Sequence, residues 1–502
     1  MPRRPRWRFG AALLLLLTCL PIAHARAEPG PYAEIDAYVR QRMKETKTPG
    51  LAYAVVGPDG PVHRRAWGTD GRGDRVTAET PFLWGSVAKP VTATAVMTLV
   101  QSGRLRLDDR VVDHLPGFRF GGPAHASKVT IRHLLEHTAG IPAPVTPRLT
   151  DCHGSGCPRP ARRLAALDDV TPLGPPGTTY AYTSVDYLVL TAVVESVTGR
   201  PLADVLRRNV FTPAGMDGAI ADTATARRRG LAPGHQLLWG LPAATADGFD
   251  EHGAGYGYVG GGIDDLAAFA SLQLRSGAPV LTPESARLMR REGRLSPGGD
   301  GTGYGLGWRI GGLDAPLDDA VWHTGGVPGY SAMLFLLPRR NLALVLHQNL
   351  YGPLQDGAIM QVGFGAARLL AGGGRPAESP SASVHHLTVW GLTAVAVALL
   401  VAAARTALLL RRPSTATARG RLAAVTAVWV TAGALPAAAM AARAGMLRPM
   451  LIWVPDAFAA VCAAAVGGAA TAVLRLALAV RAVRTGRPPA SRPATPRQKA
   501  TG

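Results

Sequence analysis

Three apolar stretches close the chain, and they constrain its fold more than any other feature. They cover roughly residues 387–410, 422–442 and 451–480, where Asp456 is the single acidic residue. Each is long enough for a helix to cross a hydrocarbon layer of about 30 Å at ~1.5 Å per residue. Soluble core helices are the alternative, but runs this apolar favour three transmembrane helices. We expect Asp456, near the outer end of the third span, to face the interface or another helix.

The first 27 residues give a second membrane signal. Residues 1–27 hold five Arg and no acid, and the apolar run 11–22 precedes Ala25-Arg26-Ala27, which is typical of a cleaved signal peptide. A retained anchor is the alternative. Four Arg lie between the first two stretches and two between the second and third, and the tail is basic. The positive-inside rule then places residues 28–386 outside a cytoplasmic membrane that the chain crosses several times, with the tail inside.

The net charge of +20 could suggest a nucleic-acid-binding protein, but its distribution argues against one. The basic excess lies at the two ends, beside the apolar runs. Residues 28–386 hold 35 basic and 33 acidic residues, a net charge of only +2. We therefore expect no nucleic-acid partner and assign the basic excess to membrane topology.

The exported region has strand patterns at both ends and helical patterns between them. Strands are predicted at 51–56, 62–67, 304–310, 320–324, 330–337 and 342–348, and helices at about 86–102, 130–137, 184–198 and 264–276. We expect an α/β (α+β) domain with one antiparallel sheet, closed by both ends of the chain and carrying a helical insertion. Cys152 and Cys157 lie in this exported part, where a short-loop disulfide is favoured over a metal site.

The segment Gly85-Ser86-Val87-Ala88-Lys89 opens a predicted apolar helix, so Ser86 and Lys89 lie one turn apart on one face. A serine hydroxyl needs a base to become a nucleophile, and a buried lysine with a lowered pKa can be that base. The helix N-terminus favours an oxyanion. By itself the pattern also fits an N-cap with a surface lysine.

Two further motifs follow. Tyr182, in Tyr180-Ala181-Tyr182-Thr183-Ser184, could pass a proton to a leaving group, although a packed aromatic is the alternative. His323-Thr324-Gly325-Gly326 lies on a predicted strand, where a cation or donor could hold a substrate carboxylate or carbonyl and glycines would let the backbone approach.

In this order and spacing, the three motifs resemble the serine β-lactamase and penicillin-binding-protein superfamily, most closely the class C and peptidase family S12 branch. The resemblance covers essentially all of residues 30–370 and implies a β-lactamase-like antiparallel sheet flanked by helices, with a helical subdomain. It implies Ser86 as the acylated nucleophile, Lys89 as the base and Tyr182 as the proton relay. It also implies an oxyanion hole made by the backbone N–H groups of Ser86 and Gly326.

Two positions depart from the family pattern. Ser184 stands where the family usually has Asn, and His323 replaces the lysine of Lys-Thr-Gly, a variant found in esterase- and peptidase-like members. Both weaken a β-lactamase assignment, because the fixed cation for the drug's carboxylate is missing. We therefore assign Ser184, His323, Thr324, Gly325 and Gly326 to substrate binding.

The combination of a signal peptide, a domain of this kind and three spans is also similar to the membrane-bound peptidases of the colibactin-maturation type. Those peptidases remove an N-acyl-D-asparagine cap from a prodrug. That similarity implies a substrate-contacting histidine near His252, which is otherwise an exposed loop residue. The recognition Asn of those peptidases has no clear counterpart in Gly326-Val327-Pro328. We expect His133 and His137 to pack the helical insertion. No metal-ligand spacing is seen, and the mechanism needs no metal or other cofactor.

The sequence thus predicts a membrane-anchored serine peptidase that acts on a peptide-like or acyl-amino-acid substrate, with an oligomeric state that stays open. The alternatives are a D,D-carboxypeptidase, a β-lactamase or carboxylesterase, and a non-catalytic receptor. The expected segments are a signal peptide (1–27), the hydrolase domain (28–375), a linker (376–386), three spans (387–480) and a basic tail (481–502).

Overall fold

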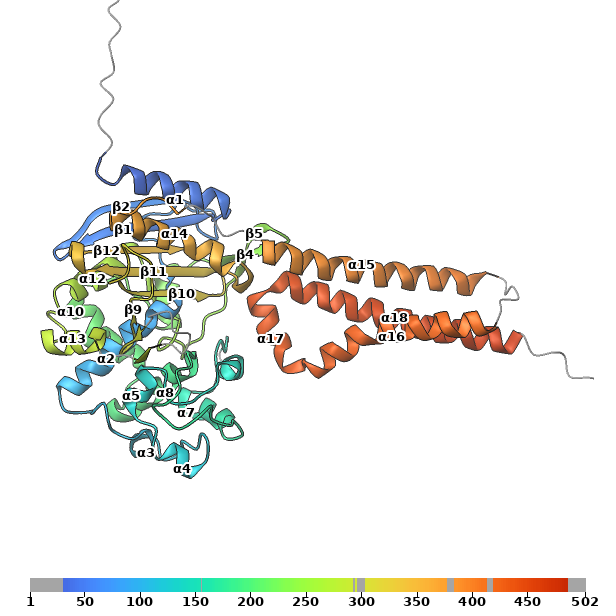
Figure 1. The fold of residues 1–502 in the computed structure, drawn as a ribbon, viewed down its shortest axis with the longest axis horizontal. Helices are drawn as coiled ribbons and strands as arrows, with labels where there is room; N and C mark the ends of the chain where they lie inside the picture. Colours follow the sequence, from blue (N-terminus) through green and yellow to red (C-terminus); the bar gives the residue numbers. More distant parts are fainter. Residues whose placement is uncertain are drawn as a thin grey trace, which may run out of the picture.

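The computed structural model describes residues 30–154, 156–291, 294–295, 303–376, 383–412 and 419–485. The expected signal peptide, linker residues 377–382 and tail residues 486–502 lie outside the described residues. Figure 1 shows a globular part from which long helices extend to one side.

The globular part is built around one eight-stranded antiparallel sheet, in the order β2-β1-β12-β11-β10-β9-β8-β7. Both ends of the domain meet in this sheet, because its second strand, β1, pairs with its third, β12, in the register Leu51 opposite Gln348. The strands are β1 (Gly50–Gly57), β2 (Gly60–Gly68), β7 (Arg294–Leu295), β8 (Gly303–Tyr304), β9 (Arg309–Ile310), β10 (Val321–Val327), β11 (Tyr330–Leu337) and β12 (Leu342–Gln348). The predicted sheet, closed by both chain ends, is confirmed.

Helices cover both faces of this sheet (Figure 1). α1 (Ala33–Glu45) and α14 (Asp356–Leu370) pack on one face. The buried residues of α1 recur every three or four positions, as an amphipathic helix requires. α12 (Ile263–Leu274) and the helical region pack on the other face. The core between the layers includes β1, which is buried along its whole length.

The insertion between β2 and β7 is mostly helical. It holds β3 (Phe82–Leu83), a 3-10 turn (Gly85–Val87), α2 (Ala88–Gln101), α3 (Val111–His114), α4 (Pro123–Ala126), α5 (Ile131–Leu135), α6 (Thr146–Leu149), α7 (Pro160–Arg163), α8 (Ser184–Thr198), α9 (Leu202–Leu206), a π-helical turn (Arg207–Phe211), α10 (Thr212–Ala214), α11 (Thr223–Arg228), β4 (Gly234–Leu238), β5 (Leu241–Ala246), β6 (Gly260–Gly261), α12 and α13 (Pro283–Arg291). Further 3-10 turns are Ala143–Val145, Leu164–Leu167, Pro338–Arg340 and Pro353–Gln355. All four predicted helical segments form helices, and 184–198 has the predicted bounds.

One strand prediction is wrong. The segment 304–310 is not a single strand, because β8 and β9 are separate and pair with each other as a tight hairpin. Gly307, at φ +88°, lies in the reversal. Leu306 and Trp308 are buried there in the core. Their apolar side chains gave the segment its strand-like pattern, but they line a turn.

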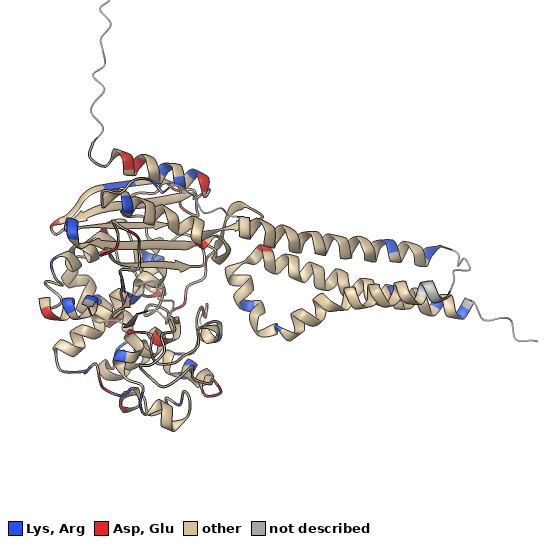
Figure 2. Ribbon diagram, viewed as in Figure 1, with Lys and Arg blue, Asp and Glu red and all other residues tan. Residues whose placement is uncertain are grey.

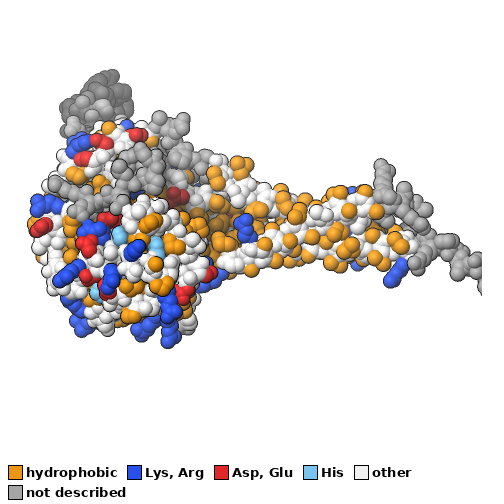
Figure 3. Space-filling model, turned by 60° about the horizontal axis from the view of Figure 1, so that its bottom comes forward, with side chains coloured by type: hydrophobic (Ala, Val, Ile, Leu, Met, Phe, Trp, Pro, Cys, Tyr) orange, Lys and Arg blue, Asp and Glu red, His pale blue; other side chains and the backbone are white. Residues whose placement is uncertain are grey.

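Three C-terminal helices are long and apolar enough to cross a membrane. They are α15 (Ser383–Arg411), α16 (Arg419–Ala442) and α18 (Pro455–Thr485). Hydrophobic side chains cover the outside of this segment, and its charged residues are few (Figures 2 and 3). The predicted third stretch begins too early, because 451–453 belong to a separate short helix, α17 (Ala444–Trp453), and Pro455 starts α18.

Polar contacts seat the globular part on these helices. Asp456 of α18 accepts hydrogen bonds from His385 Nε2 of α15 over 2.9 Å and from the backbone of Trp239, between β4 and β5, over 3.0 Å. Trp239 also donates its indole N–H to Thr393 over 2.8 Å. The expectation that Asp456 faces another helix is confirmed.

Candidate active site

Ser86 lies in a tight turn between β3 and α2, and β10 passes directly against it. Gly85 has a φ of +54°, and a Cβ there would lie 2.4 Å from the backbone nitrogen of Gly326. A Cβ on Gly325 would lie 2.1 Å from the carbonyl oxygen of Trp84. Since only glycine leaves this space free, the two motifs can meet at Ser86.

Lys89 is fully buried on the first turn of α2, and its amine holds three contacts. Lys89 Nζ lies 2.9 Å from Ser86 Oγ and 3.2 Å from Ser184 Oγ. It also donates to the backbone carbonyl of Tyr256 over 3.0 Å. Burial, and then the positive charge of Arg309, lower the pKa of Lys89 to about 7. A large share of the amine is therefore unprotonated near neutral pH and able to accept the Ser86 proton.

Tyr182 lies beside this pair, and its ring centre is 5.0 Å from Lys89 Nζ. Burial raises the pKa of Tyr182, while a hydrogen bond with Ser86 acts in the opposite direction. The hydroxyl keeps its proton at neutral pH and is placed to donate it. The three residues predicted to be catalytic are therefore brought together.

The β10 motif alternates between buried and partly exposed residues. Thr324 and Gly326 are partly exposed, whereas His323 and Gly325 are buried. Gly326 is covered by the ring of Tyr351, which a Cβ on Gly326 would meet at 2.3 Å. The partly exposed edge of β10 beside Ser86 is thus formed by Thr324 and Gly326.

His323 is fully buried and has another role than a substrate-binding cation. Its Nδ1 lies 2.7 Å from the Thr324 carbonyl, so this nitrogen must carry the proton and donate. Its Nε2 then accepts from the hydroxyl of Tyr304 over 3.0 Å. Burial lowers the pKa of His323 well below its ordinary value. The neutral ring holds β10 against β8.

Arg309 on β9 supplies a cation that the sequence analysis missed. Its guanidinium carbon lies 5.1 Å from the ring centre of Tyr182 and 5.3 Å from that of Trp322. Its Nε is buried and has no hydrogen-bond partner within the described residues. The site thus has a cation beside Tyr182, although not at the His323 position where the family has its lysine. A single Arg in a short strand carries no motif, so only the fold could reveal it.

His137 and Asp186 form a buried pair under Tyr182. His137 Nδ1 lies 2.7 Å from Asp186 Oδ2, and the His137 ring centre is 4.5 Å from that of Tyr182. Burial raises the pKa of Asp186 and lowers that of His137, which favours an uncharged pair. His137 therefore packs directly on the site. His133 stays in the helical insertion, where it belongs to the capping box of α5.

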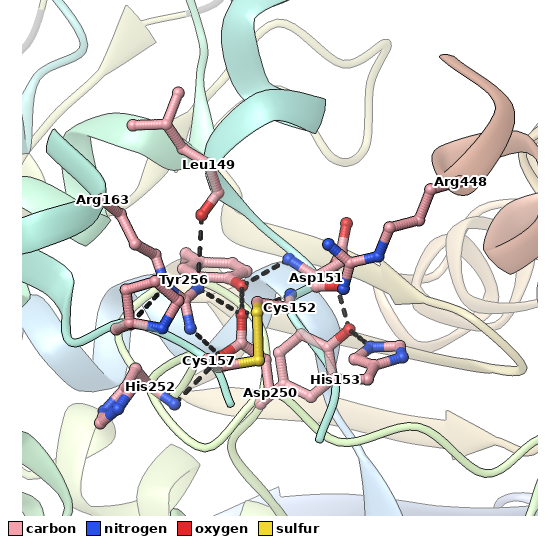
Figure 4. Close-up of a disulfide and its surroundings, with 12 residues drawn as sticks. Leu149, Asp151, Cys152, His153, Cys157, Arg163, Asp250, His252, Tyr256 and Arg448 are labelled. Carbon is pink, nitrogen blue, oxygen red and sulfur yellow. Dashed lines mark hydrogen bonds and ion pairs between the residues drawn. A yellow bond between two sulfur atoms is a disulfide. The ribbon is translucent and has the colours of Figure 1, made fainter. Parts of the chain in front are cut away.

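A loop carrying the Cys152–Cys157 disulfide lies beside Tyr256 (Figure 4), the residue whose backbone carbonyl accepts from Lys89. Asp250 is fully buried there and accepts both nitrogens of Arg163 over 2.6 and 2.7 Å. Burial would raise the pKa of Asp250, but the hydrogen bonds and charge of Arg163 outweigh it and lower the pKa. The Tyr256 hydroxyl donates to the same carboxylate over 2.6 Å. The expected disulfide is present.

His252 lies beside this loop, and its backbone N–H donates to Asp250 over 3.0 Å. Its half-buried ring lines two pockets, and Ser86, Lys89 and Tyr182 line neither of them. The structure therefore does not bring His252 together with the other predicted site residues. Within the described residues, no group of three His, Cys, Asp or Glu side chains could hold a metal ion.

Comparisons with known proteins agree with this geometry. The family model described as Beta-lactamase matches residues 35–362. Penicillin-binding protein 4 of Amycolatopsis lactamdurans is 38% identical over 299 residues, which are 57% of this chain and 74% of that protein. Esterase EstB of Burkholderia gladioli is 31% identical over 60% of this chain and 83% of its own length. Unguisins hydrolase ungD' of Aspergillus campestris is 27% identical, and the chain spans 61% of its length.

Solved structures share the fold. The octameric penicillin-binding protein homologue from Pyrococcus abyssi superposes with a TM-score of 0.59 at 22% identity, over 70% of this chain and 79% of that chain. The structure of SurE superposes with a TM-score of 0.54 at 27% identity, over 69% of this chain and 78% of that chain.

Proposed function

Since the chain belongs to the beta-lactamase family and is a serine hydrolase, we propose that it is a membrane-anchored peptidase that cleaves an acyl-(D-)amino-acid amide outside the cytoplasm. The observation that carries this proposal is the 2.9 Å contact between Ser86 Oγ and a buried lysine amine whose pKa is about 7. Maturation of a secreted natural-product prodrug is the biological role we favour.

In the proposed mechanism, Lys89 accepts the hydroxyl proton of Ser86 as the Ser86 oxygen attacks the substrate carbonyl carbon. The backbone N–H groups of Ser86 and Gly326 donate to the resulting oxyanion. Tyr182 then delivers a proton to the leaving amine and regains one from the Lys89 ammonium, the C–N bond breaks, and an ester on Ser86 remains. Water hydrolyses this ester, which releases the acid and restores the Ser86 hydroxyl.

The proposed location rests on charge and length. The helices α15, α16 and α18 would cross the membrane, and residues 1–27 would direct the domain through it before cleavage. Arg411, Arg412, Arg481 and Arg484 lie at the end of the helices away from the domain (Figure 2). The positive-inside rule puts this end in the cytoplasm and the active site outside.

The test is release of product from a panel of acyl-D-amino-acid amides, D-Asn included, by the full-length protein in detergent or nanodiscs. Ser86→Ala is the control, because it removes the nucleophile and leaves the binding surface. We expect release by the wild-type protein and none by the variant. No release from any member of the panel would refute the peptidase proposal.

A D,D-carboxypeptidase is the second candidate, and Arg309 is the observation that favours it. Such an enzyme must bind the free carboxylate at the end of its substrate, and a guanidinium suits a carboxylate. Labelled penicillin separates the two candidates, since durable acylation of Ser86 favours the carboxypeptidase. Rapid turnover of nitrocefin or of p-nitrophenyl esters would instead indicate a β-lactamase or an esterase. If Ser86 reacted with none of the fluorophosphonate or β-lactam probes, a non-catalytic receptor would be favoured.

A further inference from the structure

The short helix α17 joins the apolar C-terminal segment to the disulfide loop of the catalytic domain. Trp453 donates its indole N–H to the carboxylate of Asp151 over 3.1 Å. Arg448 donates to the backbone carbonyl of Asp151 over 3.1 Å, and in Figure 4 its side chain reaches Asp151 from the opposite side to Asp250. Gln236 of β4 donates to the carbonyl of Ile452 over 2.9 Å. Gln236 also donates to the carbonyl of Trp453 over 3.2 Å, so these four hydrogen bonds fix α17 to the domain.

Asp151 is an unusual residue to find at such a junction. It is only 9% exposed and has a φ of +56°, a conformation that a non-glycine residue rarely adopts. Burial raises the pKa of its carboxyl group. Its carboxylate accepts from the hydroxyls of Tyr258 over 2.8 Å and of Thr150 over 3.2 Å, as well as from Trp453. Losing a donor is costly for a buried acceptor, so the indole of Trp453 helps to hold the loop in this conformation.

The loop reaches Lys89 through Tyr256. The backbone N–H of Asp151 donates to the Tyr256 hydroxyl over 2.9 Å, and that hydroxyl donates to Asp250 over 2.6 Å. Both ends of this link are therefore buried and hydrogen-bonded. The carbonyl oxygen of the same Tyr256 accepts from Lys89 Nζ over 3.0 Å. The backbone of Tyr256 is thus one of the three groups that aim the amine.

We infer that α17 is part of the active site: Trp453, Asp151 and Tyr256 are positioning residues that aim the amine of Lys89 at Ser86. The inference rests on the proposed function, because it assigns these roles for the acylation of Ser86. It makes the apolar C-terminal segment a working part of the enzyme as well as its anchor.

Several charged or titratable groups face Lys89 and are common to all the variants below. Arg309 of β9 lowers the pKa of Lys89, whereas Asp186 of α8 and Asp151 of the loop raise it. His137, which follows α5, and His323 of β10 face the same amine. Weakening the hold on Asp151 and on the Tyr256 carbonyl removes stabilisation from the ammonium form only. The pKa of Lys89 should then fall.

The experiment measures acylation of Ser86 by a fluorophosphonate against pH, using the full-length protein in nanodiscs. Trp453→Phe removes the indole N–H and keeps an aromatic ring. Its matched control is Trp390→Phe, at a position of α15 that is 52% exposed. We expect Trp453→Phe to lower the maximal acylation rate about tenfold and to move the midpoint of the profile to lower pH. We expect Trp390→Phe to behave as the wild-type protein does.

A second variant keeps the inference testable if Trp453→Phe does not fold. Tyr256→Phe removes the hydroxyl from the same chain of contacts and leaves the backbone carbonyl, so it should move the rate and the midpoint in the same directions. The double variant should be little worse than either single one, because the two act through one path. Additive losses in the double variant would overturn the inference.

The inference would also be overturned if either variant kept the wild-type midpoint and a maximal rate within twofold of wild type. This holds even if the melting temperature of that variant falls. Failure of the proposed function looks different. In that case the wild-type protein would not be acylated at Ser86 by any probe.

Discussion

The guanidinium carbon of Arg309 lies 5.1 Å from the centre of the Tyr182 ring, and its positive charge lowers the pKa of Lys89. One side chain thus influences both the proton acceptor and the proton donor of the proposed reaction. Its buried Nε has no hydrogen-bond partner within the residues that the structure describes.

Arg309→Met should lower kcat/KM ten- to a hundredfold for substrates with a free carboxylate, since a hydrogen bond to a charged group contributes about 1.5–3 kcal/mol. A neutral p-nitrophenyl ester should lose less than threefold at a pH where Lys89 is unprotonated. Steady-state kinetics on both substrates measures the difference. Arg287→Met is the control, at an exposed residue of α13 whose Nε donates to the carbonyl of Pro283 within the same helix. Equal losses on the two substrates would exclude carboxylate binding.

Lys89→Arg should abolish acylation nearly as completely as Lys89→Ala. Arginine keeps the positive charge but cannot accept the Ser86 proton near neutral pH. The measurement is kcat/KM for ester hydrolysis, with circular dichroism to show that the variant folds. More than a tenth of wild-type kcat/KM, a loss under about 1.4 kcal/mol, would make Lys89 an electrostatic helper.

The acylation rate should rise with pH and level off above a midpoint near 7. The neutral amine is the base, and the pKa of Lys89 is lowered to about 7, so the active fraction grows as pH rises through that value. The plateau should persist into the alkaline range because burial raises the pKa of Tyr182. Fluorophosphonate labelling from pH 5 to 9 measures the curve. Arg309→Met should move the midpoint upward, and a flat wild-type profile would contradict the assignment.

Ser184→Asn should lower peptidase turnover and leave Ser86 reactive towards a small fluorophosphonate. The Ser184 hydroxyl lies 3.2 Å from Lys89 Nζ. The larger asparagine side chain would fill space beside Ser86 and crowd the substrate. Turnover of acyl-D-amino-acid amides and penicillin labelling are the two measurements, and the second could rise. Ser184→Ala should cost less than Ser184→Asn if space decides, and as much or more if the hydroxyl relays a proton. Wild-type activity in both variants would make Ser184 a neutral replacement.

A reporter fused after Gly502 should be active only if it is of a kind that functions in the cytoplasm. This prediction follows from the positive-inside rule, because the loop between the first two spans holds four Arg and the tail is also basic. Paired fusions to alkaline phosphatase and to a fluorescent protein that folds in the cytoplasm measure it. Phosphatase activity with a dark fluorescent protein would place the tail outside.

The sequence predicted the sheet and the placement of Ser86, Lys89 and Tyr182 because those features depend on local pattern. Two strand-like runs joined by a turn such as Gly57-Pro58-Asp59-Gly60 identify a hairpin within one stretch of chain. Ser86 and Lys89 are one helical turn apart, so their contact follows from spacing alone.

The features that sequence reasoning missed depend on distant segments that only the fold brings together. Arg309 is 127 positions after Tyr182 in the chain, and Trp453 is 302 positions after Asp151. Neither pair carries a motif. The burial of His323 was missed for another reason: a strand gives alternate residues to opposite faces, and the sequence does not say which face holds the site.

The seat of the catalytic domain on α15, α17 and α18 also limits where the enzyme can work. In the proposed topology, the contacts of Asp151, Trp239 and Gln236 hold the active site at a fixed height above the outer face of the cytoplasmic membrane. A domain on a long flexible tether could reach a wide volume, whereas this domain is held at a fixed distance from the membrane. With that topology, a compound leaving the membrane, or diffusing along its surface, would pass within reach of Ser86, whereas material in a distant cell-wall layer would not.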